Sequence, residues 1–230
     1  MNRLLLLVPV ITVLAAPASA QTILSLTASG SASAIPDEAV AELEIQATKP
    51  NAAAAQAAVN QAAAKALAAA KAVQGVSATT GNYNTYSVVP DQQTKPSFIA
   101  QQSLTLVQPA QGGVPDAAFS HLLATLQSDG LLLTGLNGDL SATAARKLQR
   151  DATLDALSEL RTQAKSIADA LHEKVVALQS LNVDTAGGFA PPIGPRMMAM
   201  AASAPAPQSA PDKMSITTRV SAKIELAPTP

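Results

Sequence analysis

The strongest constraint on the fold is the last alternating stretch of the chain, residues 214–226. Apolar and polar residues alternate there without a break, which is typical of a half-buried β-strand. The segment before it, 185–212, is rich in Ala, Pro, Gly and Ser, has no period, and predicts a mobile loop. Because a strand that returns after so long a loop completes a sheet begun earlier, residues 21–230 are expected to form one α+β unit.

Two further strands are predicted near the start of the chain, at 22–34 and 38–49. The second places five small or branched apolar residues on one face: Ala39, Ala41, Leu43, Ile45 and Ala47. Proline fixes φ and lacks an N–H, so the intervening segment is expected to form a turn with Pro36 at its second position. Gly30 lies inside the first strand and is expected to mark a bulge.

Three helices are predicted between the remaining strands, at residues 51–74, 115–129 and 141–172. The first is alanine-rich and should end in a left-handed C-cap at Gly75, and the third should be capped by Ser141. Four more strands are predicted at residues 80–90, 97–109, 131–140 and 174–184. The expected class is therefore α+β, with antiparallel sheets packed with long helices in the order ββαββαβαββ.

The first twenty residues have the pattern of a secretory signal peptide. Arg3 precedes an apolar run, and Ala18-Ser19-Ala20 provides a small-residue cleavage site. The apolar run is short for a membrane span, so cleavage after Ala20 and release into the periplasm are expected, without a transmembrane span. Peripheral association with the envelope, including the outer membrane, is left open.

The amino-acid composition argues against several kinds of site. The chain contains no cysteine, which excludes disulfides and thiolate metal sites. Its formal net charge is −1, and it has three Phe, two Tyr and no Trp. Because no basic patch and few stacking side chains are present, nucleic-acid binding is not expected.

Several residues could in principle support chemistry. Ser120 and His121, with Asp116 or Asp129, would suggest a hydrolase, but the sequence contains no nucleophile elbow. A surface or packing role is therefore preferred for His121. His172 lies near a helix end, where the helix dipole favours a cationic imidazole.

Two other groups have an alternative functional interpretation. Glu42 and Glu44 share one strand face, about 7 Å apart, and are interpreted as a solvated face rather than a glycosidase pair. Met197, Met198 and Met200 offer thioethers that suit Cu(I), or an adaptable hydrophobic contact for another subunit. No catalytic residue and no cofactor is predicted, and these methionines are the only metal candidates.

The elements and their order resemble the SIMPL-domain family, the exported YggE-like proteins of bacteria. The resemblance covers about residues 24–226 and rests on Gly30-Ser31, Pro36-Asp37-Glu38-Ala39, the helix ending at Gly75, Thr80…Tyr83/Tyr86…Val88, Phe98-Ile99-Ala100, and the helix from Ala144-Ala145-Arg146 to Ala170-Leu171. Two segments depart from the family pattern. Leu171-His172-Glu173 stands where the family's long helix ends in glycine, and Pro211-Asp212-Lys213 replaces a Pro-Gly-Glu turn.

The resemblance implies an oligomer-forming envelope protein linked to stress tolerance. It implies that Gly30, Pro36, Asp37 and Gly75 are structural landmarks, and it supplies no catalytic residues. The leading hypothesis is an exported, non-enzymatic, self-associating protein. The alternatives are a periplasmic hydrolase using His121 and a Cu(I)-binding protein using the methionines at 197–200.

Overall fold

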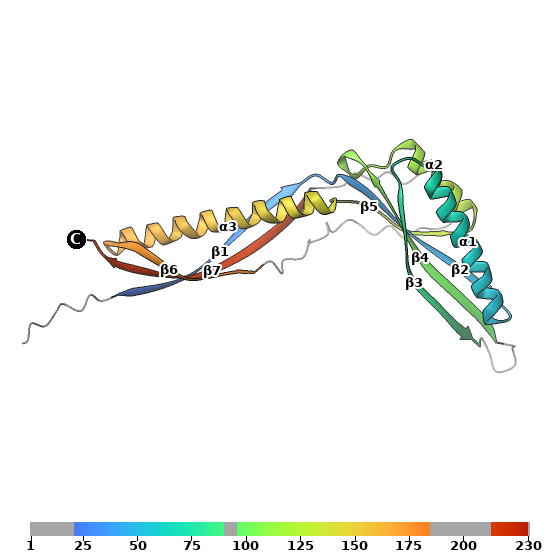
Figure 1. The fold of residues 1–230 in the computed structure, drawn as a ribbon, viewed down its shortest axis with the longest axis horizontal. Helices are drawn as coiled ribbons and strands as arrows, with labels where there is room; N and C mark the ends of the chain where they lie inside the picture. Colours follow the sequence, from blue (N-terminus) through green and yellow to red (C-terminus); the bar gives the residue numbers. More distant parts are fainter. Residues whose placement is uncertain (1–20, 90–95, 185–212, 230) are drawn as a thin grey trace, which may run out of the picture.

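The chain folds into two bodies, each built on one antiparallel sheet (Figure 1). The structure is a computed structural model and describes residues 21–89, 96–184 and 213–229. The order of the main helices and strands is ββαββαβαββ, as predicted. The fold class is therefore confirmed, and the long helix and its sheet give the molecule an elongated shape.

The first body is a three-stranded sheet with one long helix on one face. Its strand order is β1 (Thr22–Ala34), β7 (Met214–Pro228) and β6 (Glu173–Asp184). The helix is α3 (Ala142–Ala170), which packs mainly on β1 and β7. Because β7 lies between the first strand and β6, the prediction that the last strand completes an earlier sheet is confirmed.

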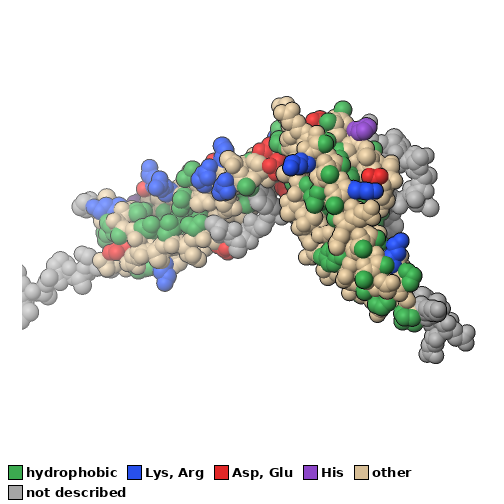
Figure 2. Space-filling model, turned by 45° about the vertical axis from the view of Figure 1, so that its right-hand side comes forward, with side chains coloured by type: hydrophobic (Ala, Val, Ile, Leu, Met, Phe, Trp, Pro, Cys, Tyr) green, Lys and Arg blue, Asp and Glu red, His purple; other side chains and the backbone are tan. Residues whose placement is uncertain are grey.

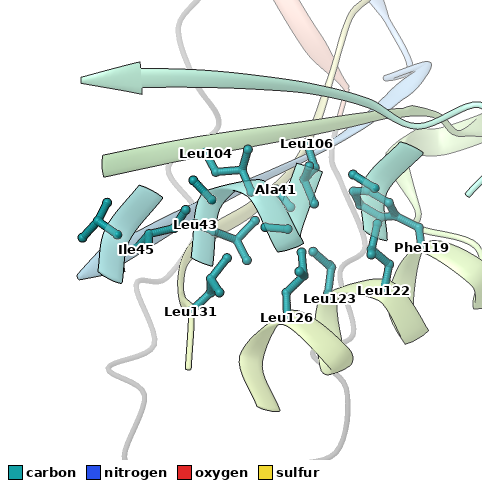
Figure 3. Packing of buried hydrophobic residues seen from close by; sticks show 14 of the residues in the cluster. Ala41, Leu43, Ile45, Leu104, Leu106, Phe119, Leu122, Leu123, Leu126 and Leu131 are labelled. Atoms are coloured by element: carbon teal, nitrogen blue, oxygen red, sulfur yellow. The ribbon is translucent and has the colours of Figure 1, made fainter. Parts of the chain in front are cut away.

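The second body is a four-stranded sheet covered on one face by two helices. Its strand order is β3 (Ser77–Val88), β4 (Ser97–Pro109), β2 (Glu38–Lys49) and β5 (Leu132–Asp139). The helices are α1 (Ala52–Ala72) and α2 (Ala117–Ser128), and a short 3-10 turn, η1 (Gln111–Gly113), precedes α2. In Figure 3, leucines of β2 and β4 meet Phe119, Leu122 and Leu126 of α2 in one buried cluster.

The face of β2 that the sequence predicted to be apolar is buried, so the predicted alternation is confirmed. Ala39, Ala41, Leu43 and Ile45 are buried against the helices. Many of the buried side chains of α1 are alanine, so this helix lies close to the sheet while burying little area per residue. The leucines and the phenylalanine supply most of the bulk in this core.

Local side chains begin each helix. Asn51, Asp116 and Ser141 accept hydrogen bonds from backbone N–H groups three residues further on, at 2.8, 2.8 and 3.2 Å. These N-caps satisfy donors that have no partner within the helix. The cap predicted at Ser141 is therefore confirmed.

The helix ends differ from the prediction. α1 stops at Ala72 with Val73 as its extended C-cap, and Gly75, with φ of +80°, lies in the following turn rather than at the cap. At the end of α3 the left-handed position after the C-cap is taken by His172, with φ of +56°. His172 is thus outside the helix, and its backbone has the left-handed conformation that glycine usually adopts at this position.

The role predicted for Gly30 was wrong. The pairing of β1 with β7 runs without a register shift from Thr22 to Ala34, so there is no bulge at this glycine. Instead, a Cβ atom at Gly30 would collide with the backbone of α3, at Ala156 N and 2.5 Å from the Ala152 carbonyl oxygen. The absence of a side chain at Gly30 therefore allows the backbone of α3 to lie close to the strand.

The segment around Pro36 also differs from the expected turn. Residues 35–37 form an irregular connection that takes the chain from the three-stranded sheet to the four-stranded sheet. β1 and β2 are therefore not neighbours. The chain returns to the first body at residues 140–141, between β5 and α3.

Candidate functional site

The two connections between the bodies are held together by Asp37. Its Oδ1 accepts a hydrogen bond from the Ser141 backbone N–H at 2.6 Å, and its Oδ2 accepts one from Ser141 Oγ at 2.8 Å. The Asp37 N–H donates to the Asp139 carbonyl oxygen at 3.0 Å, and its own carbonyl oxygen accepts from Ala110 N–H at 2.8 Å. Asp37 therefore joins both connections, and it also holds the residue that caps α3.

Acidic groups gather at the same junction. The pKa of Glu38 is raised above its ordinary value of 4.5, first by burial and then by the charges of Asp37 and Asp139. The folded protein therefore holds this proton more tightly than the unfolded chain does. The corresponding stability is fully present below pH 4.5 and is lost as the pH rises through the folded pKa.

We expect Glu38→Gln to raise the thermal unfolding midpoint at pH 7, because it removes a carboxylate that burial and like charges disfavour. At pH 3.5 or so the substitution should have little effect, since Glu38 is then protonated in both states. Thermal unfolding at the two pH values checks this. An equal change at both would show that the effect is not electrostatic.

The uncovered face of the four-stranded sheet is polar. A shallow groove there is lined by carboxylate, amide and hydroxyl side chains, among them Glu42, Glu44, Asn84, Gln101 and Ser103. Glu42 is exposed and Glu44 is half-buried. Both side chains lie opposite the helices, on the face that the sequence predicted to be solvated.

The structure separates the residues of the hydrolase alternative. His121 is exposed on α2, and its carbonyl oxygen accepts a hydrogen bond from Thr125 Oγ1. Asp116 caps the start of this helix and binds Gln108 Nε2 at 2.7 Å, while Asp129 follows the other end. Met197, Met198 and Met200 lie outside the described residues, as does the loop predicted at 185–212.

Exposed apolar side chains follow the outer strand β6. Val175, Leu178 and Leu181 pair with Leu226, Ile224 and Ala222 of β7, which are buried beneath α3. Residues that lie opposite each other in a ladder share a face, so these three side chains are on the α3 side of the sheet. They nevertheless remain 48%, 56% and 44% exposed. We call them the β6 apolar row.

The position of α3 explains this exposure. The helix packs mainly on β1 and β7 and leaves the outer strand largely uncovered. Figure 2 shows hydrophobic side chains gathered on this body, with most of its Lys and Arg side chains along the upper edge. Among the described residues of the first body, this row is an exposed apolar surface of the kind that contacts other proteins.

The sequence predicted β6 as a strand but did not reveal its exposure. Two register shifts interrupt its pairing with β7, between Val175 and Ala177 and between Leu178 and Ser180. Each adds a residue, so the large apolar residues recur at steps of three rather than two. That irregular spacing is the sequence signal for the bulges.

Comparison with known proteins places the chain in a family. The family model SIMPL, described as a protein of unknown function (DUF541), matches residues 24–224. The chain therefore belongs to the SIMPL family, as its sequence pattern indicated. A search of curated proteins finds no match. None of the helices in the described residues has the length and apolar character needed to cross a membrane.

Proposed function

We propose that this SIMPL-family chain is an exported, self-associating protein of the bacterial envelope that acts through assembly rather than catalysis. The signal-peptide pattern supports export to the periplasm. A link to stress tolerance is the physiological role that the family resemblance suggests. The proposal concerns a structural or binding role, with a second copy of the chain as the first partner.

The β6 apolar row is the observation that carries the proposal. Three large aliphatic side chains lie half exposed on the face of a sheet that one helix covers incompletely. Removing apolar surface from water is favourable by about 25 cal/mol per Å². Contact with another copy would bury this row without rearranging either body.

Size-exclusion chromatography with light scattering on the chain lacking residues 1–20 tests the proposal. The expected result is a homo-oligomer at micromolar concentration. A monomer at high micromolar concentration would contradict self-association. Separating the periplasmic fraction of expressing cells tests the location, and recovery of the uncleaved chain in the cytoplasm would oppose it.

A charge in the β6 apolar row should weaken association while leaving the fold intact. We expect Leu178→Glu to lower the oligomer fraction, because the carboxylate would be desolvated at the contact. Its cost to folding should stay within about 0.5 kcal/mol, since the side chain is exposed. Leu132→Glu is the matched control, because Leu132 is 61% exposed on β5 of the other body. Equal loss of oligomer in both variants would show that the row has no special role.

Activity assays distinguish the assembly proposal from the hydrolase alternative. The purified chain should show no turnover of ester, phosphoester or glycoside substrates above background. Turnover in the parent that is lost in His121→Ala would overturn the non-enzymatic assignment. For Cu(I) binding, titration of the parent against a variant with Met197, Met198 and Met200 replaced by leucine gives the corresponding test.

A further inference from the structure

The outer strands of the two sheets differ in how well they are protected against pairing with another chain. β3, β5 and β6 each contain a register shift in the described pairing, and β6 also carries Glu173, Lys174 and Asp184. β1 has no register shift over Thr22–Ala34 and contains neither a charged residue nor a proline. Bulges, charges and prolines are the usual protection of an edge strand, and β1 has none of them.

One hydrogen bond identifies which backbone groups of β1 point away from the sheet. The Ser31 N–H donates to Asp155 Oδ2 of α3 at 2.9 Å, rather than to β7. In an antiparallel ladder, residues alternate between those that bond the partner strand and those that face away from it. Because the register is unbroken, Ile23, Ser25, Thr27 and Ser29 face outward in the same way as Ser31.

Asp155 also limits how much of this edge is open. It satisfies the Ser31 N–H, close to Gly30, where α3 lies directly over β1. Further toward the N-terminus, Leu24 and Leu26 are only partly buried. Within the part of the chain that the structure describes, the open part of this edge is therefore residues 23–29.

We propose that the β1 strands of two copies pair antiparallel over residues 23–29, which joins the two three-stranded sheets into one six-stranded sheet around a twofold axis. This rests on the proposed self-association and names a second contact between copies, since β1 and the β6 apolar row lie at opposite edges of the three-stranded sheet. The middle of the open stretch is Leu26, so the axis passes beside it. Ile23 then lies opposite Ser29 of the second copy, and Ser25 lies opposite Thr27, with their outward N–H and C=O groups facing each other.

A second copy suits this edge because the stretch is complementary to itself. On the α3 side, Leu26 meets Leu26 and Leu24 meets Ala28, so the partly buried leucines are covered by apolar neighbours. On the other side, Ser25 meets Thr27, so small hydroxyl groups face each other, and Ile23 meets Ser29. The stretch contains no charged residue, so no like charges face each other across the twofold axis.

Replacing Thr27 with proline tests the pairing. The N–H of Thr27 points away from β7, so its loss removes no hydrogen bond between β1 and β7. We expect Thr27→Pro to form a smaller assembly than the parent by light scattering, because the contact through β1 is lost. Thr27→Val is the matched control. Both variants lose the Thr27 Oγ1 contact with Ser221 Oγ, at 3.2 Å, but only valine keeps the N–H.

Thr27→Val should therefore keep the parent's oligomeric state, and circular dichroism of both variants should match that of the parent. An oligomeric parent whose state is unchanged in Thr27→Pro would overturn pairing through β1 and leave self-association standing. A monomeric parent would overturn both.

A cysteine scan gives an independent measurement, since the parent chain has no cysteine. In the proposed register, Leu26 faces Leu26 of the second copy as a pair without mutual backbone hydrogen bonds. The Cα atoms of such a pair are about 4.5 Å apart, which suits a disulfide. Leu26→Cys should therefore form a disulfide-linked dimer under mild oxidation. Leu24→Cys should not form this disulfide, because residue 24 lies on the same face but faces Ala28, not residue 24, of the second copy. Equal cross-linking at both positions, or none at Leu26→Cys in an oligomeric chain, would contradict the proposed register.

Discussion

Replacing Gly30 with alanine should lower the free energy of unfolding by about 3 kcal/mol, because the added methyl group has no space. It would overlap Ala156 N and lie 2.5 Å from the Ala152 carbonyl oxygen. Both atoms belong to the backbone of α3, so no change of side-chain rotamer relieves the contact. The helix would have to move away from β1, which would open the core around Ala28 and Val220.

Urea unfolding of the Gly30→Ala variant measures this effect. Ser29→Ala is the matched control, since Ser29 is the exposed neighbour on the same strand and its replacement should change stability by less than about 0.5 kcal/mol. Adding Ala156→Gly should not rescue Gly30→Ala, because the obstructing atoms remain. A Gly30→Ala chain as stable as the parent would show that α3 does not lie this close to β1.

Replacing Asp37 with alanine should cost about 1–2 kcal/mol and alter the relative orientation of the two bodies. The carboxylate accepts two hydrogen bonds from Ser141, at 2.6 and 2.8 Å, and bonds to charged groups are among the stronger ones. Because Asp37 is exposed, we expect the lower part of the usual range for such bonds. Each body has a separate hydrophobic cluster, so both should remain folded.

A double-mutant cycle with Ser141→Ala isolates this interaction. Ser141→Ala also removes the N-cap of α3, which is worth about 1 kcal/mol, and the cycle separates that term from the coupling between the two side chains. Small-angle X-ray scattering of Asp37→Ala should show a broader distribution of interatomic distances than the parent. If the stability losses of the two single variants add up to that of the double variant, and the scattering curve is unchanged, Asp37 does not hold the connections together.

These two positions are among the residues on which the resemblance to the family rests, and neither has any evident chemistry. Gly30 permits the close approach of a helix, and Asp37 bonds a serine 104 positions away in the sequence. Neither needs to contact a ligand for its replacement to be costly. The resemblance implied that they are structural landmarks, and in the structure Gly30 faces the backbone of α3 while Asp37 bonds Ser141.

The sequence by itself determined the order of elements and the side-chain faces of the best-patterned strands. Alternation in β2 and β7 and the N-cap at Ser141 are local properties, set by residues within one turn or a few positions of each other. They survive in the folded protein because tertiary contacts reinforce them. For the same reason, the family could be inferred before any contact was known.

Only the tertiary structure decided how these elements were shared between two sheets. Nothing local to residues 35–37 specifies that β1 pairs with the end of the chain while β2 pairs with β4 and β5. The outward N–H groups of β1 follow from its pairing with β7 at the edge of the sheet, and the role of Gly30 and the exposure of the β6 apolar row follow from where α3 lies. That position results from packing between residues far apart in the sequence, which local propensity and periodicity do not encode.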